Sequence, residues 1–264
     1  ICLNTFCLSC SVLRHLKILL MSLKDKLIKY AELVKFEHTI FALPFGLASV
    51  LLLYKSFPSL TKLFWIVVAL VSARTAGMAL NRLIALPIDV KNPSTKEWVH
   101  AKGEVKEKEI KTLILISGGV FVLSTLFINL YAFLLSPVVL FLLWLYPYSK
   151  RFTHFPHLVL GLIYFLIPIG VDVALNERVS LVAVLLGIAM AFWVAGFDVL
   201  YALQDYEFDK ENNIKSLPVL LGIEGAIKVS RLFHLITFVS LLLLGFVSDR
   251  LGLFYFLGLL LIAG

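Results

Sequence analysis

Apolar runs long enough to cross a lipid bilayer recur along the whole chain. A membrane-spanning helix needs about 20 mostly apolar residues, and runs close to this length lie near 39–54, 63–81, 112–130, 132–148, 157–175, 180–203, 227–247 and 251–264. Only 16% of the residues are charged, against about 25% in an ordinary soluble domain, so most of the surface must face lipid. The sequence therefore predicts an all-α integral membrane protein with eight visible transmembrane helices.

The distribution of Lys and Arg between the loops predicts the orientation of these helices. The segments 21–38, 82–111, 149–156 and 204–231 carry seventeen of these residues, whereas the alternate loops carry four. Short loops rich in Lys and Arg stay on the cytoplasmic side. We therefore expect the N-terminus and the long loops to face the cytoplasm, in the cell inner membrane. No basic stripe interleaved with aromatic residues lies on a polar element, which argues against a nucleic-acid partner.

Both ends of the chain differ from a typical membrane domain. Met21 opens a segment that is typical of a cytoplasmic start. Arg14 and Lys17 follow an apolar run, whereas a signal peptide carries its positive charges first. We interpret residues 1–20 as upstream or non-native sequence, or alternatively as a short interfacial helix. Residues 21–264 are interpreted as one transmembrane domain that is truncated inside its last helix.

Two polar segments with acidic residues follow the second and the sixth predicted helices. Residues 73–96 read ARTAGMALNRLIALPIDVKNPSTK, and residues 195–216 read AGFDVLYALQDYEFDKENNIKS. A shift of 120 residues pairs Asn81 with Tyr201, Ala85 with Asp205, Asp89 with Asp209, and Asn92 with Asn212. An even number of predicted helices separates the two copies, so we expect both on the same side of the membrane.

The spacing of the acids in the second segment favours a divalent metal site. On a helix, a spacing of four residues stacks Asp205 on Asp209, with Asp198 and Tyr201 on the same stripe. Stacked carboxylates repel each other unless a cation or water separates them, and Mg²⁺ prefers carboxylate, amide and phosphate oxygens. A solvated helix end with scattered charges is the alternative interpretation, and the repeat favours the metal site.

Basic residues near these segments are candidates for binding phosphate. Lys150 and Arg151 follow the fourth predicted helix. Taken alone they set the topology, but beside a metal–diphosphate site they can bind a departing diphosphate. Arg74 lies inside the second predicted helix, where a charged residue is costly and more often functional. Alternatively, Arg74 pairs with an acid such as Asp172 or Asp198.

Other residue types that carry chemistry show no pattern of a site. His38, His154, His157 and His234 lack ligand spacing, and we interpret them as interfacial or packing residues. The three cysteines lie within the first ten residues, which excludes a thiolate metal site in the helical body. Neither a Ser-His-Asp constellation nor a Gly-rich phosphate loop is found.

Three motifs in order resemble the UbiA superfamily of membrane aromatic prenyltransferases. The similarity runs from about residue 35 to residue 222. It covers the NxxxDxxxD segment at 81–89, the YxxxK segment at 146–150 and the YAxQDxxxD segment at 201–209. The stretches YPYSKRFTHFPHLVLGL and DVLYALQDYEFD are similar to the 4-hydroxybenzoate polyprenyltransferase branch. The resemblance implies a bundle of nine transmembrane helices around a central cavity roofed by cytoplasmic loops.

The resemblance also implies a role for individual positions of this chain. The implied ligands of Mg²⁺ are Asn81, Asp89, Asp205 and Asp209. The implied diphosphate-binding residues are Lys150 and, as weaker candidates, Arg82 and Arg151. Catalytic candidates near the ionising bond are Asp198, Tyr146 and Tyr201.

One departure from the family pattern weakens the first metal segment. The pattern has Asp where this chain has Ala85, and Pro87 stands where the branch often has a further acid. Alanine cannot bind a metal, and proline removes a helical hydrogen bond. We expect a kink just before Asp89 and a metal site short of one carboxylate.

The expected activity is transfer of a polyprenyl group from an allylic polyprenyl diphosphate to an aromatic acid. The acceptor that the resemblance favours is 4-hydroxybenzoate, in quinone biosynthesis. One alternative keeps the reaction and changes the acceptor to a dihydroxynaphthoate, on a menaquinone route. Another alternative is a catalytically degenerate cation-binding membrane protein that lost activity through Ala85.

Overall fold

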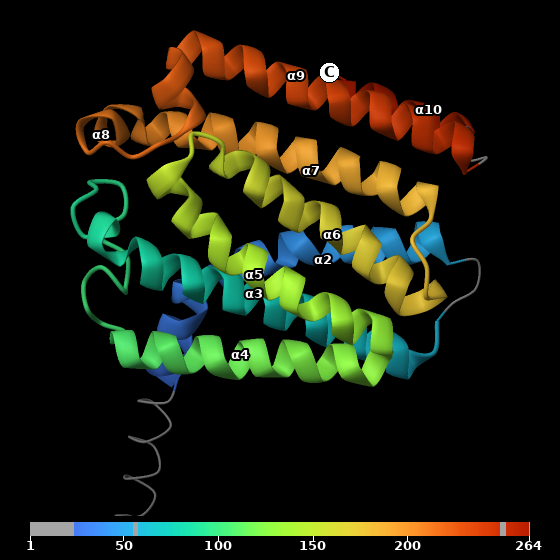
Figure 1. The fold of residues 1–264 in the computed structure, drawn as a ribbon, viewed down its shortest axis with the longest axis horizontal. Helices are drawn as coiled ribbons and strands as arrows, with labels where there is room; N and C mark the ends of the chain where they lie inside the picture. The colour runs from blue at the N-terminus through green and yellow to red at the C-terminus, as the bar shows by residue number, and fades with distance from the viewer. Residues whose placement is uncertain (1–23, 55–57, 249–251, 264) are drawn as a thin grey trace, which may run out of the picture.

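The computed structural model describes residues 24–54, 58–248 and 252–263, and the segment 1–20 lies outside them. Within these ranges the structure is all-helical, and the long helices lie side by side as one bundle (Figure 1). A short helix over residues 24–33 precedes the bundle. The other elements are α2 (Phe36–Leu53), α3 (Leu60–Asp89), α4 (Glu107–Ile128), α5 (Leu130–Phe152), α6 (Pro156–Asn176), α7 (Leu181–Tyr201), the 3₁₀ turn η1 (Ala202–Asp205), α8 (Tyr206–Glu211), α9 (Leu217–Val247) and α10 (Leu253–Ala263).

Six helices of the described chain are long and apolar enough to cross a membrane. They are α3, α4, α5, α6, α9 and the segment Leu181–Glu211, which contains α7. Each coincides with a predicted transmembrane helix, so those six predictions are confirmed. The predicted helix at 39–54 falls on α2, and the one at 251–264 falls on the 11-residue α10. Large apolar side chains such as Leu115, Phe127 and Leu134 are exposed on the outer surface, as expected where lipid covers it. The chain is an integral, multi-pass membrane protein.

The structure corrects two predicted helix ends. The second predicted helix stops at residue 81, but α3 continues through Pro87 to Asp89, so the 81–89 segment is helical. The predicted single stripe is interrupted between Tyr201 and Asp205, because η1 separates α7, which carries Asp198 and Tyr201, from α8, which carries Asp209. A 3₁₀ turn has three residues per turn, so the spacing of four from Tyr201 to Asp205 no longer stacks these side chains, whereas the residues between Asp205 and Asp209 belong to α8.

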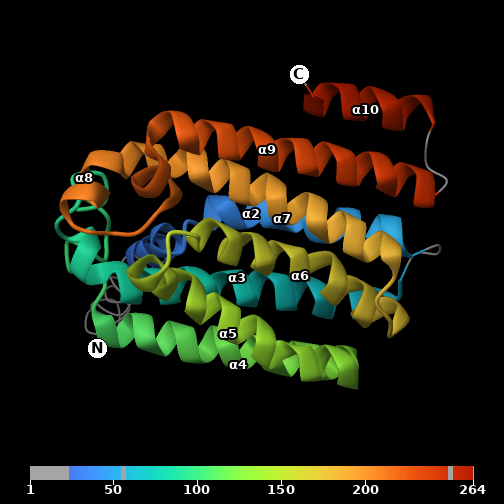
Figure 2. The same cartoon turned by 45° about the horizontal axis from the view of Figure 1, so that its top comes forward.

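The two acidic segments lie at the same end of the bundle, as the repeat predicted. The loop 90–106 after α3 and the elements η1 and α8 after α7 meet there (Figures 1 and 2). We call this the α8 end. The single-domain organisation of residues 21–264 stays a prediction.

The short helix 24–33 supports the loop 90–106. Leu33 is 1% exposed and packs with Ala79, Val105 and Ile110. The Tyr30 hydroxyl donates to the Glu109 carboxylate across 3.2 Å. Burial, reinforced by this hydrogen bond, raises the pKa of Tyr30, so the hydroxyl remains a donor at neutral pH.

Glycines allow α6 and α7 to pack closely. A Cβ atom on Gly161 would lie 2.8 Å from the backbone oxygen of Ala191, and one on Gly187 would lie 2.9 Å from the backbone oxygen of Phe165. Small residues serve the same purpose in many membrane helix pairs, where close backbone approach provides the packing energy.

Gly161→Ala is expected to lower the midpoint of thermal unfolding in detergent, because the added methyl group meets backbone that cannot rotate away. Overpacking of this kind costs about 1–3 kcal/mol. Gly119→Ala in α4 is the matched control, since its Cβ would have nothing within 4 Å. Circular dichroism measures the unfolding midpoint of each variant. Equal midpoints for the two variants would contradict the close contact between Gly161 and the Ala191 backbone.

Candidate active site

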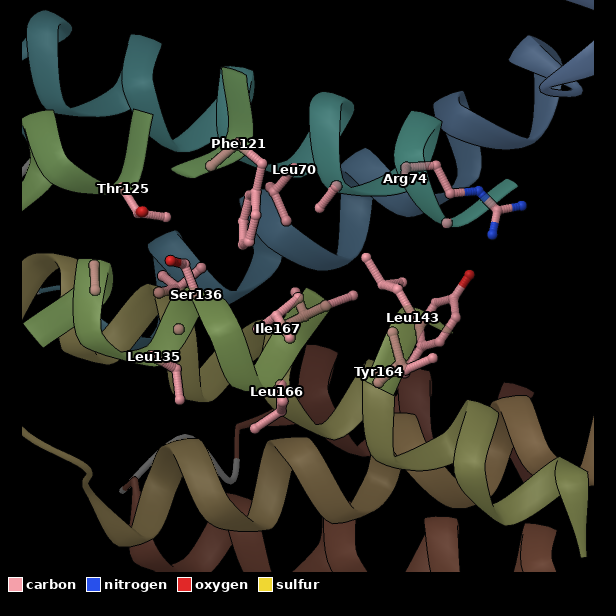
Figure 3. A pocket seen from close by; sticks show the side chains of 18 of the residues that line it. Leu70, Arg74, Phe121, Thr125, Leu135, Ser136, Leu143, Tyr164, Leu166 and Ile167 are labelled. Carbon is pink, nitrogen blue, oxygen red and sulfur yellow. The ribbon is translucent and has the colours of Figure 1, made fainter. Parts of the chain in front are cut away.

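An apolar cavity of about 170 Å³ lies among α3, α4, α5 and α6 (Figure 3). Its walls include Leu70, Phe121, Leu143 and Ile167. An engineered apolar cavity of about 150 Å³ stays dry and binds benzene, so this cavity has room for an apolar group of similar size. The space is suited to part of a hydrocarbon ligand rather than to water.

The part of the cavity near the α8 end is polar. Arg74, Asn81 and Tyr146 line it, and Figure 3 shows Arg74 at one end of the cavity with Thr125 near the other. The Arg74 Nε atom is buried and has no hydrogen-bond partner among the described residues. A buried unpartnered polar group is costly, so Arg74, at the cavity wall, is a candidate for binding an anionic ligand.

The alternative in which Arg74 pairs with Asp172 or Asp198 is not found, because no ion pair between Arg74 and an acid is present among the described residues. Asp172, in the α6–α7 corner, accepts from the Asn176 side chain at 2.6 Å and from the Ser180 backbone N–H at 2.7 Å. It therefore stabilises a helix corner.

Asp198 is bound by a histidine that the sequence analysis interpreted as a packing residue. The His157 Nδ1 atom lies 2.7 Å from Asp198 Oδ2. The Leu217 backbone N–H donates to His157 Nε2 across 3.4 Å, which makes Nδ1 the donor to Asp198. His157 is 1% exposed, and these contacts join the start of α6 to the ends of α7 and α9 that meet it. No spacing signal could have revealed this pair, since 41 residues separate its members.

Asp89 ends α3 and is bound by His100 from the following loop. The His100 Nε2 atom lies 2.8 Å from Asp89 Oδ2, and both residues are buried. The Thr95 hydroxyl donates to the Asp89 backbone oxygen across 2.8 Å. His100 was not among the predicted site residues, because a lone histidine in a polar loop carries no motif.

Asp205 is contacted by the first acidic segment. Its Oδ1 atom accepts from the Asn92 side-chain amide at 3.1 Å and from the Ser94 hydroxyl at 2.8 Å. Asn92 Oδ1 in turn accepts from the Ser94 backbone N–H at 2.9 Å, and the Ser94 hydroxyl oxygen also lies 2.9 Å from it. The two segments that the repeat relates are therefore in direct contact.

Asp209 lies in α8 and is 8% exposed. Lys150, Asp205 and His157 are close enough to act on its charge. The Lys150 backbone oxygen also accepts from the Lys215 N–H across 3.1 Å, which joins the end of α5 to the chain after α8.

The other predicted residues differ in how free they are to bind a ligand. The Arg82 guanidinium lies 3.9 Å from the centre of the Trp98 ring, and its Nε donates to the Leu33 backbone oxygen across 3.4 Å. The Arg151 side chain donates to the backbone oxygen of Ile84 across 3.1 Å. Tyr201 is 49% exposed at the end of α7.

The predicted metal ligands do not form a closed cage in this structure. Within the part of the chain that the structure describes, no group of three His, Cys, Asp or Glu side chains converges on one point. Mg²⁺ is usually bound by one or two carboxylates, water and substrate phosphates rather than by an all-protein cage. The donor set of Asp205, Asp209 and the nearby amides therefore fits Mg²⁺ that binds together with a diphosphate.

Comparison with known proteins gives consistent matches along most of the chain. A 4-hydroxybenzoate octaprenyltransferase from Actinobacillus pleuropneumoniae serotype 3 is 32% identical over 248 residues, covering 89% of this chain and 82% of that protein. A UbiA homologue from Aeropyrum pernix K1, solved in the apo state, has a TM-score of 0.78 and 34% identity, over 85% of this chain and 84% of the other.

A third similar protein is a UbiA homologue from Archaeoglobus fulgidus, solved bound to GPP and Mg²⁺. Its TM-score is 0.70 at 19% identity, over 89% of this chain and 83% of that one, which supports the fold. Residues 42–264 match the UbiA prenyltransferase family as a whole. The chain thus belongs to the UbiA prenyltransferase family.

Proposed function

We propose that this protein transfers a polyprenyl group from an allylic polyprenyl diphosphate to an aromatic acid. The acceptor best supported is 4-hydroxybenzoate, because the similar Actinobacillus protein is named as an octaprenyltransferase of this acid. The product would be a quinone precursor, on a ubiquinone route. The Lys and Arg distribution supports an orientation with the α8 end at the cytoplasmic face of the inner membrane.

The observation that carries this proposal is the change from apolar to polar along one cavity. Most of its lining is hydrocarbon, and Arg74, Asn81 and Tyr146 lie along the half nearer the α8 end. At the other end, the Thr125 and Ser136 hydroxyls donate to carbonyls of their own helices. A ligand that matches this surface has a long apolar tail and an anionic head. A polyprenyl diphosphate and an aromatic acid together meet both requirements.

Diphosphate binding is assigned to the α8 end. Lys150 is the main candidate for binding the phosphate oxygens, because Arg82 and Arg151 already bind Trp98 and a backbone oxygen. When bound, Mg²⁺ would neutralise charge on the departing diphosphate. Asp205 and Asp209 are its proposed ligands, with Asn81 and Asp89 contributing from the first segment.

Arg74 is proposed to bind the carboxylate of the acceptor. It lies seven residues before Asn81 on α3, which is about 10 Å deeper in the bundle at 1.5 Å per residue. An acid held there would direct its ring towards the α8 end, where the carbon–oxygen bond of the prenyl diphosphate breaks. The surrounding apolar walls would exclude water from the allylic cation, and the face of Tyr146 would stabilise its charge.

Asp198 is proposed to take part near the reacting carbon, together with Tyr146. The two groups are close enough to act on each other electrostatically. The hydrogen bond from His157 Nδ1 keeps the Asp198 carboxylate oriented, as a base or a charge stabiliser requires. A role for Tyr201 is proposed from the family motif alone.

Mg²⁺-dependent prenyl transfer to 4-hydroxybenzoate in liposomes is expected for the wild-type protein, and Asp205→Asn is expected to reduce it by about 100-fold or more. The loss of a charged metal ligand should reduce activity by more than the roughly 10–100-fold that follows from losing a group that only orients such a ligand. Glu207→Gln is the matched control, because Glu207 is an exposed acid of the same segment. Product formation is followed by chromatography with a short allylic diphosphate.

The same assay separates the alternatives. Faster transfer to a dihydroxynaphthoate would identify a menaquinone-type acceptor. Absence of turnover with either acceptor, together with activity in Ala85→Asp, would contradict the proposed function and indicate a degenerate site.

Arg74→Met is expected to raise the KM for 4-hydroxybenzoate by about 10–100-fold. A hydrogen bond to a charged group contributes about 1.5–3 kcal/mol, and about 1.4 kcal/mol corresponds to a factor of ten. The KM for the prenyl diphosphate should change little. The methyl ester of the acceptor has no carboxylate, so its transfer should be insensitive to the substitution. Equal losses for acid and ester would exclude Arg74 as the carboxylate-binding residue.

A further inference from the structure

The loop 90–106 brings a buried histidine to the last residue of α3. His100 is 2% exposed, and its Nε2 atom lies 2.8 Å from Asp89 Oδ2. The other ring nitrogen, Nδ1, is buried without a hydrogen-bond partner among the described residues. Within the same residues, no hydrogen bond to the second carboxylate oxygen of Asp89 is present. The histidine therefore binds one oxygen of Asp89, and the other oxygen has no hydrogen bond among the described residues.

Several contacts hold His100 in this position. The Thr95 hydroxyl donates to the Asp89 backbone oxygen and fixes the start of the loop on α3. The Trp98 ring lies 5.9 Å from the His100 ring, and Trp98 itself covers the Arg82 guanidinium. The loop is thus attached to α3 at Asp89 and at Arg82, through residues that precede His100.

We infer that His100 is a positioning residue that fixes the Asp89 carboxylate for binding of the metal–diphosphate pair. This inference rests on the proposed function. A carboxylate that already has one oxygen bound has fewer orientations to lose when a ligand binds. Groups that hydrogen-bond to metal ligands commonly affect metal affinity by about 10–100-fold.

Ala85 gives this positioning its importance in this chain. The segment 81–89 has one carboxylate, on Asp89, because position 85 is alanine. With no second carboxylate in the segment, the direction of Asp89 decides whether α3 can contribute a charged ligand at all. His100 thereby orients the single carboxylate of a segment in which Ala85 provides no second one.

The test compares His100→Leu with His100→Gln, whose amide nitrogen can replace Nε2 as a donor to Asp89. Mg²⁺ is titrated in the presence of an unreactive prenyl thiodiphosphate, and the unfolding midpoint of each full-length variant is measured against its own Mg²⁺-free value. His100→Leu should raise the half-saturating Mg²⁺ concentration by about 10–100-fold, and His100→Gln should restore it to within a few-fold of wild type. Lys102→Gln is the matched control, since it removes only the exposed ion pair with Glu97 in the same loop.

The outcomes distinguish this inference from the proposed function. A wild-type Mg²⁺ response in His100→Leu would overturn the positioning role alone. Equal losses in the leucine and glutamine variants would also overturn it, because a purely structural histidine predicts no rescue. Absence of any Mg²⁺-dependent stabilisation in the wild-type protein would overturn the proposed function and this inference with it.

Discussion

The cost of burying charge in a lipid-embedded bundle governs how this protein is built. A charged side chain inside the membrane needs a partner, because neither lipid nor apolar packing can solvate it. Asp172 and Asp198 satisfy this requirement at opposite ends of α6 and α7. One binds Asn176 and a backbone N–H at the α6–α7 corner, and the other binds His157. The same hydrogen bonds that satisfy these acids therefore fix both ends of the closely packed helix pair.

Arg74 is a charged residue inside the bundle that lacks a full set of protein partners. Its Nε atom is buried without a partner among the described residues, beside an apolar cavity. An anionic ligand would complete the hydrogen bonding, so binding energy is available to a carboxylate that the protein itself does not supply. The bundle thus combines an apolar cavity wall with a cation whose hydrogen-bonding capacity the described residues leave unused, as the proposed binding of the acceptor carboxylate by Arg74 requires.

The sequence predicted the parts of this structure that depend on the membrane, and missed those that depend on local packing. Hydropathy located six helices because lipid imposes a minimum length on each. It could not predict that α3 continues to Asp89, since the polar pair Asn81 and Arg82 and the helix breaker Pro87 indicate a helix end. The 3₁₀ turn before Asp205 was also missed, because a spacing of four residues presupposes a continuous α-helix.

The site was predicted in its motifs but not in the contacts that support them. Acidic residues at regular spacing are visible in a sequence, whereas a hydrogen bond such as His157–Asp198 spans 41 residues and leaves no periodic signal. The loop that provides His100 also provides Asn92, which donates to Asp205 across 3.1 Å.

These contacts make the two repeated segments unequal. In the second segment both aligned positions are acids, Asp205 and Asp209, whereas the first has Ala85 and Asp89. The first segment instead extends an amide and a hydroxyl to Asp205, and its own remaining acid, Asp89, is hydrogen-bonded by His100 from the loop that follows. Two acids brought close together repel each other, and neutral hydrogen-bond donors orient a carboxylate without that repulsion. The absence of a carboxylate at position 85 is therefore compatible with an ordered site. The first segment can act mainly by orienting the acids that are present, without providing a further carboxylate.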